Sequence, residues 1–147
     1  MISSINSSTL SILKIALTSL ALVLCAFSAF NERHIHFHHG DMRRVIDQAI
    51  SEDKMIFVDV YASWCTSCKL MEESTFRAEK VVHLINAHYV PVMINVESLE
   101  GELFAAQEHI TTLPALLVLN KEGKKLTQVN HALQTEGMLQ LLKKHLK

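Results

Sequence analysis

The residues best suited to chemistry in this 147-residue chain are Cys65 and Cys68. Two cysteines separated by two residues can open and close a disulfide: one thiolate attacks a substrate disulfide, and the second thiol resolves the mixed disulfide. Cys65 follows an apolar run and stands at the predicted start of a helix, where unpaired backbone N–H groups and the helix dipole favour a thiolate. We therefore expect Cys65 to be the attacking group and Cys68 the resolving one.

The cysteine pair also has alternative uses. A structural zinc site needs two further ligands, and the chain offers no second cysteine pair. A purely structural disulfide across so short a loop contributes little stability. His34, His36 and His38 alternate, so an extended segment would project them to one side, where imidazoles can hold copper or zinc. The alternative function is therefore a copper-binding assembly protein that uses the cysteines and this histidine run, although such a run is commonly a solvated linker.

The elements that must position the cysteines are predicted from the apolar periodicity. Four apolar runs are typical of strands: residues 55–61, 89–96, 115–119 and 125–129. Helices are expected after the N-cap Asp41 and over residues 65–78, 79–87, 101–108 and 135–147. Strands joined through a helix must be parallel, and the hairpin turn at 120–124 adds antiparallel strands. The order predicts an α/β fold, a three-layer α/β/α sandwich around a mixed four- to five-stranded sheet.

The first thirty residues form a separate segment. They contain no acidic residue, and the run at 15–30 is apolar apart from a threonine and two serines. This run is long for a signal-peptide core and short for a membrane span. We expect residues 1–30 to be a signal peptide or N-terminal membrane anchor and residues 31–40 a polar His-rich linker or an irregular edge of the fold. Residues 41–147 are then the folded domain, in the periplasm or another extracytoplasmic compartment, anchored to the inner membrane by residues 15–30 where that run is not removed.

The composition narrows the class of protein further. Hydrophobic residues make up 49% of the chain and charged residues 20%, which is typical of a globular protein. The formal net charge is −1, and no long run carries one sign. A nucleic-acid-binding surface needs clustered Lys and Arg, so none is expected.

Residues 58–69, Val-Asp-Val-Tyr-Ala-Ser-Trp-Cys-Thr-Ser-Cys-Lys, resemble the active-site segment of the thioredoxin superfamily. The continuation at 70–76, Leu-Met-Glu-Glu-Ser-Thr-Phe, is similar to the C-terminal periplasmic thioredoxin-like domain of the thiol:disulfide interchange protein DsbD. The resemblance covers residues 41–147. It implies an enzyme, a thiol:disulfide oxidoreductase that reduces protein disulfides and needs no cofactor beyond the Cys65–Cys68 pair.

Two departures from these families bear on function. Thr66 and Ser67 stand where typical thioredoxins have Gly-Pro, which leaves the redox potential open. The large membrane-embedded domain of DsbD has no counterpart in this sequence, so we expect a separate electron-donor protein, which in the DsbD-like case is membrane-embedded. The other partners implied are protein disulfides or dithiols.

The resemblance also implies roles for five further residues. Asp59 is the acid within a strand, where burial should raise its pKa and suit it to exchange a proton with Cys68. Glu72 lies one helical turn after Cys68, on the same face and near the cysteines. Trp64 shields the nucleophile and contacts the substrate. Leu113 and Pro114 match the cis-proline loop, whose backbone pairs with an extended substrate segment.

Overall fold

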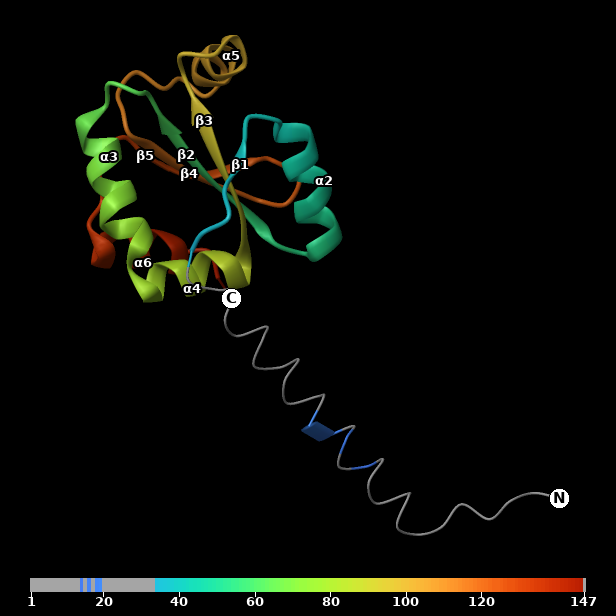
Figure 1. The fold of residues 1–147 in the computed structure, drawn as a ribbon. Helices are drawn as coiled ribbons and strands as arrows, with labels where there is room; N and C mark the ends of the chain where they lie inside the picture. Colours follow the sequence, from blue (N-terminus) through green and yellow to red (C-terminus); the bar gives the residue numbers. More distant parts are fainter. Residues whose placement is uncertain (1–13, 15, 17, 20–33, 147) are drawn as a thin grey trace, which may run out of the picture. The chain divides into compact units, whose positions relative to one another are not determined.

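A strand buried on both faces, β2 (Met55–Tyr61), lies at the centre of the sheet. It pairs in parallel with β3 (Tyr89–Asn95) and antiparallel with β4 (Ala115–Leu119). β5 (Lys125–Val129) continues the sheet beyond β4, and β1 (His38–His39) pairs in parallel with β3 at the other edge. The result is a mixed five-stranded sheet of order β1-β3-β2-β4-β5, which confirms the predicted fold class (Figure 1).

This computed structural model describes Lys14, Ala16, Thr18, Ser19 and residues 34–146. The predicted signal peptide or anchor therefore lies almost wholly outside the described residues. Within the described residues, no helix is long and apolar enough to cross a membrane.

Helices cover both faces of the sheet. Side chains of a buried strand alternate between its two sides, so apolar groups on both sides need to be covered. Ile56, Val58 and Val60 of β2 pack with Val45 and Ala49. These last two belong to α2 (Met42–Glu52), which begins at the N-cap Asp41, whose carboxylate accepts the Arg44 N–H at 3.2 Å.

The opposite face carries a second core. Phe57 and Met138 belong to it, together with residues of α3 (Thr66–Glu73), α4 (Glu79–His88) and α6 (Thr135–Lys143). The sheet between these two helical layers makes the three-layer sandwich that the periodicity predicts (Figure 1).

The predicted helix over residues 65–78 is interrupted. α3 ends at Glu73, and a short 3-10 helix, η1 (Thr75–Arg77), follows before α4 begins. The hydroxyl of Ser74 donates to the carbonyl oxygen of Leu70 at 2.5 Å, and the Ser74 N–H donates to the same oxygen at 3.1 Å. Serine side chains compete in this way with the backbone hydrogen bonds of a helix. This explains why the helix breaks here although the apolar periodicity continues on both sides.

The predicted linker at residues 31–40 differs from what the structure shows for its described part, residues 34–40. The ring of Phe37 packs against Phe76 with centroids 5.3 Å apart and against Phe57 at 6.4 Å. The Gly40 N–H donates to the Met93 carbonyl oxygen at 3.2 Å. The segment therefore belongs to the folded domain, because one aromatic side chain among the histidines reaches the core.

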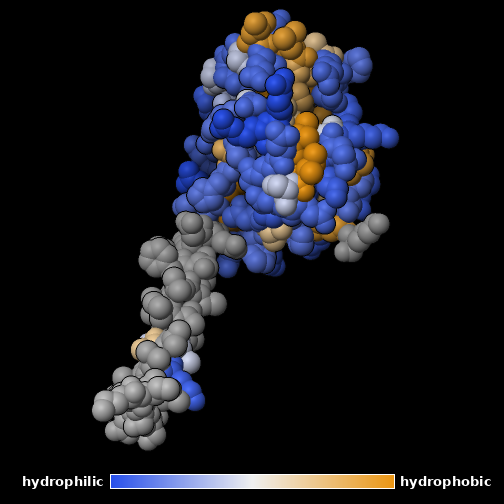
Figure 2. All heavy atoms as spheres, turned by 90° about the vertical axis from the view of Figure 1, so that its right-hand side faces the viewer, coloured by the Kyte–Doolittle hydropathy of each residue, from blue (hydrophilic) through white to orange (hydrophobic). Residues whose placement is uncertain are grey.

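The helix α5 (Leu99–Gln107) follows β3 and packs through Phe104 on the same face as α2. Its outer side is unusually apolar, since Leu99 is 75% exposed and Leu103 is 63% exposed. Figure 2 shows apolar atoms gathered at the end of the domain where α5 lies, above a mainly hydrophilic surface. Gly101, in the first turn of this helix, is buried against the end of β3.

We expect Gly101→Ala to destabilise the domain by about 1–3 kcal/mol, because its new Cβ must displace backbone. The Cβ would overlap the backbone carbonyl oxygen of Asn95. Urea unfolding followed by circular dichroism measures the loss.

The matched control is Gly137→Ala in α6, where the Cβ would meet only the Leu133 side chain, at 3.3 Å. There the better helix propensity of alanine makes the variant neutral or more stable by up to about 1 kcal/mol. Equal stabilities of the two variants would show that the turn before α5 is not tightly packed.

Candidate active site

Cys65 and Cys68 form a disulfide at the N-terminus of α3. Cys65 is the N-cap of this helix, and its Sγ accepts the Cys68 N–H at 3.2 Å. The Ser67 hydroxyl lies 3.6 Å from the same sulfur. Both cysteines are largely buried, at 4% and 5% exposed. The structure thus places the pair at the start of a helix, as the sequence predicts.

Asp59 is a buried carboxyl group on the β2 face that α3 covers. The residue is 1% exposed, and its Oδ1 has no hydrogen-bond partner within the described part of the chain. Desolvation by burial raises the pKa of Asp59 to about 7, and the negative charge of Glu72 adds to the increase. A carboxyl group that titrates near neutral pH can accept or return a proton under ordinary conditions.

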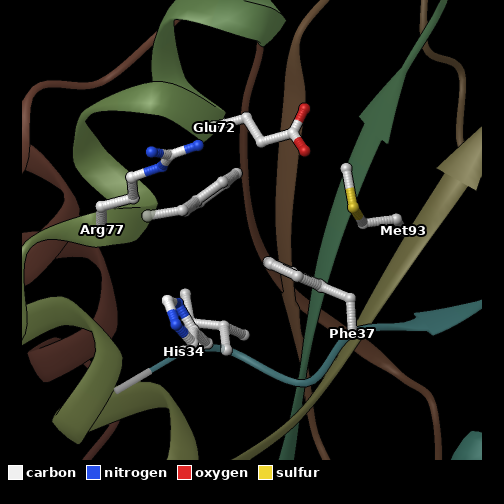
Figure 3. A pocket seen from close by; sticks show the side chains of 7 residues that line it. His34, Phe37, Glu72, Arg77 and Met93 are labelled. Carbon is white, nitrogen blue, oxygen red and sulfur yellow. The ribbon is translucent and has the colours of Figure 1, made fainter.

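A small cavity of about 70 Å³ connects this acid to Cys68, because Asp59, Cys68 and Glu72 all line it. Glu72 also lines a second, larger pocket of about 200 Å³ with His34, Phe37, Arg77 and other residues (Figure 3). Figure 3 shows the Glu72 carboxylate extending from α3 on the side of Met93, which lines both cavities. The exposed Glu72 therefore stands between the outer pocket and the buried acid.

The loop before β4 reaches the cysteines from the other side. Leu113 is half-buried and packs against the cluster of Ala62, Cys65 and Cys68. The Leu113–Pro114 peptide bond is cis, and Pro114 is buried. Trp64, next to Cys65, is 68% exposed, so its ring is available at the surface beside the pair.

The histidine run lies apart from the cysteines in its contacts. His34 lines the larger pocket, and His38 starts β1 at the sheet edge. In residues 34–146 and the four described positions before them, no group of three or more His, Cys, Asp or Glu side chains is placed to hold a metal ion. The copper-binding hypothesis thus has no supporting observation in the described residues.

Two residues that the sequence analysis did not single out also belong to this site. The carboxylate of Glu97 accepts hydrogen bonds from the Ser63 N–H at 2.6 Å and the Ser63 hydroxyl at 2.9 Å. Ser63 lies two residues before Cys65, whereas Glu97 is far away in sequence, after β3. The only sequence signal for this contact is the predicted parallel pairing of the two strands, which brings their carboxyl ends to one edge.

A mixed sheet with a disulfide at this helix start and a facing cis-proline loop defines a thioredoxin-like protein. The family model described as a thioredoxin-like domain matches residues 42–146, and the chain belongs to that family.

Among its relatives, DsbD of Pseudoalteromonas atlantica is 32% identical over 89 residues, which is 59% of this chain and 15% of that protein. This chain thus spans only a small part of that relative. A solved C-terminal domain of Neisseria meningitidis DsbD in the oxidised form has a TM-score of 0.60 at 19% identity, over 70% of this chain and 91% of that one. A thioredoxin from Thermus thermophilus has a TM-score of 0.66 at 16% identity, over 74% and 85%. The chain thus resembles disulfide oxidoreductases and shares their fold.

We expect the stability of the protein to fall relative to Asp59→Asn as pH rises from about 4 to about 7. The folded state holds the Asp59 proton up to its raised pKa of about 7, whereas the unfolded chain releases it near 3.8. Between these values the folded state binds more protons, so stability is full below the lower pKa and is lost towards the upper one. The difference should change by roughly 3–4 kcal/mol and stay level above about pH 8. Urea unfolding of both proteins across this range measures it.

Glu72→Gln serves as the companion variant. Without the Glu72 charge, burial still raises the pKa of Asp59, but to a lower value. The fall in stability should therefore persist and end at a lower pH. If the wild-type protein and Asp59→Asn keep a constant difference at every pH, Asp59 does not titrate in this range.

Proposed function

We propose that this protein is an extracytoplasmic thiol:disulfide oxidoreductase that reduces disulfides in other proteins. The observation that carries the proposal is the Cys65–Cys68 disulfide at the start of α3, with the carboxyl group of Asp59 buried behind it. The Oδ1 atom of that group has no hydrogen-bond partner among the described residues. Family membership and the likeness to DsbD support the same reaction class.

The reaction proceeds through two thiol–disulfide exchanges. The Cys65 thiolate attacks one sulfur of the substrate disulfide, forming a mixed disulfide and releasing the first substrate thiolate. Asp59, as a carboxylate, takes the proton of the Cys68 thiol through the cavity that both line. The Cys68 thiolate then attacks the Cys65 sulfur, which closes the Cys65–Cys68 disulfide and releases the second substrate thiolate. Two electrons have passed to the substrate.

The substrate and the electron donor are both proteins in this proposal. An extended substrate segment pairs with the backbone of Leu113 beside the cysteines, and Trp64 supplies an exposed apolar contact. A separate dithiol protein returns the two electrons by the reverse exchange. No cofactor other than the cysteine pair takes part.

We expect Cys68→Ser to accumulate mixed disulfides with disulfide-bonded substrate proteins, because Cys65 can attack but nothing resolves the product. Cys65→Ser should accumulate none. Non-reducing electrophoresis and intact mass after incubation with insulin measure the adducts, and reduction of insulin by the wild-type protein checks turnover.

The double variant Cys65→Ser, Cys68→Ser controls for nonspecific adducts. Equal trapping by the two single variants would reverse or abolish the assigned roles. A wild-type protein that leaves insulin disulfides intact would contradict the proposed activity.

We further propose that residues 1–30 export the domain, on the basis of the apolar run at 15–30. Fusion of residues 1–40 to a phosphatase that requires its own disulfides should give an active enzyme in a bacterial host. Residues 31–40 alone, fused in the same way, are the control. An inactive fusion with residues 1–40, produced in equal amount, would argue against export.

A further inference from the structure

Glu97 holds the backbone immediately before the catalytic pair. Its two carboxylate oxygens accept the N–H and the hydroxyl of Ser63, at 2.6 and 2.9 Å. Ser63 lies inside a turn closed by the Cys65 N–H, which donates to the Ala62 carbonyl oxygen at 3.1 Å. We call residues 62–65 the catalytic turn. Both hydrogen-bonding groups of Ser63 thus fasten this turn to a residue from another part of the fold.

The segment that carries Glu97 is held by hydrogen bonds of its own. The Asn95 side chain accepts the Glu97 N–H at 3.0 Å. The Asn95 carbonyl oxygen accepts the Ser98 N–H at 3.1 Å and the Ser98 hydroxyl at 2.9 Å. The Ser98 hydroxyl in turn accepts the Gly101 N–H at 3.0 Å, which caps α5. The carboxylate is therefore held in place before it meets Ser63.

The sheet brings these two segments together. Tyr61 and Asn95 are the paired last residues of the parallel strands β2 and β3. The Val96 N–H donates to the Tyr61 carbonyl oxygen at 3.0 Å, and the Val96 side chain packs against the cluster that contains both cysteines. Glu97 follows at once, so its side chain meets the catalytic turn across the sheet edge.

We propose that Glu97 is a positioning residue for disulfide exchange, which holds the catalytic turn so that Cys65 meets Cys68 and the substrate in a fixed geometry. The statement about substrates rests on the proposed function, whereas the effect on the Cys65–Cys68 pair does not. Because Cys65 is only 4% exposed, a small movement of the turn changes the access of an incoming sulfur to it.

The role is local rather than global. Glu97 and Ser63 are both exposed, so solvent screens their interaction and the domain should lose little stability without it. The hydrogen bonds from Ser63 lower the pKa of Glu97, which keeps its carboxylate charged and able to accept both donors near neutral pH. A residue that acts on the turn alone should therefore change the cysteine chemistry much more than the unfolding transition.

The experiment compares Glu97→Ala, Glu97→Gln and the control Glu102→Ala. Glutamine can keep both contacts, because its carbonyl oxygen accepts the Ser63 N–H and its amide donates to the hydroxyl. Glu102 is exposed in the same helix–turn region, and its side chain makes no hydrogen bond or ion pair with any described residue. The measurements are the Cys65–Cys68 equilibrium with glutathione, the rate of insulin reduction, and urea unfolding.

We expect Glu97→Ala to weaken the Cys65–Cys68 disulfide about tenfold against glutathione, a potential roughly 30 mV less negative, because the two sulfurs are held together less well. Insulin reduction should slow by about tenfold. Glu97→Gln should stay within about twofold of the wild type in both measurements, and Glu102→Ala should match the wild type.

Two results would overturn the proposal. If Glu97→Ala keeps the glutathione equilibrium of Glu102→Ala, the carboxylate does not position the pair. If Glu97→Gln loses as much as Glu97→Ala, the charge acts and the hydrogen bonds do not. A wild-type protein that fails to reduce insulin would contradict the proposed function, while the glutathione equilibrium of the variants would still test Glu97.

Discussion

The rest of the site depends on the pairing of β2 on both of its edges. Hydrogen bonds to β3 and β4 fix the strand over residues 56–60, so the backbone that carries Asp59 has no freedom to bring its carboxyl group to water. The same pairing sets the point at which the chain leaves the sheet and turns into α3. The depth of the acid and the place of the cysteine pair are thus two results of one strand alignment, and neither can shift without the other.

The sequence predicts most of this architecture because the central strands are continuous apolar runs. β2, β4 and β5 occupy the predicted residues, and β3 ends one residue earlier. The two-residue β1 has no periodicity to read, and its segment is recognised as part of the domain only from the packing of Phe37 and the pairing with β3 in the structure. Of the site, the cysteines, Asp59 and the loop of Leu113 follow from local pattern and family resemblance. The contact between Glu97 and Ser63 does not, because it depends on which strands become neighbours.

The structure shows what surrounds Thr66 and Ser67, which stand where typical thioredoxins have Gly-Pro. In this chain two donors lie near the Cys65 sulfur, the Cys68 N–H at 3.2 Å and the Ser67 hydroxyl at 3.6 Å. A glycine or a proline at position 67 has no hydroxyl to offer. Hydrogen bonds to a thiolate favour the charged form, so a Ser67 hydroxyl that keeps this position in the reduced pair would stabilise the Cys65 thiolate.

Met93 lies beside the buried acid. It is aligned with Asp59 across the parallel strands and forms part of the wall of both cavities, with Glu72 beside it. An unbranched thioether adapts its shape to irregular space, so this side chain shapes the cavity wall beside the buried acid. Because burial is the main cause of the raised pKa of Asp59, the size of the side chain at position 93 bears on that pKa, although a thioether exchanges neither a proton nor an electron.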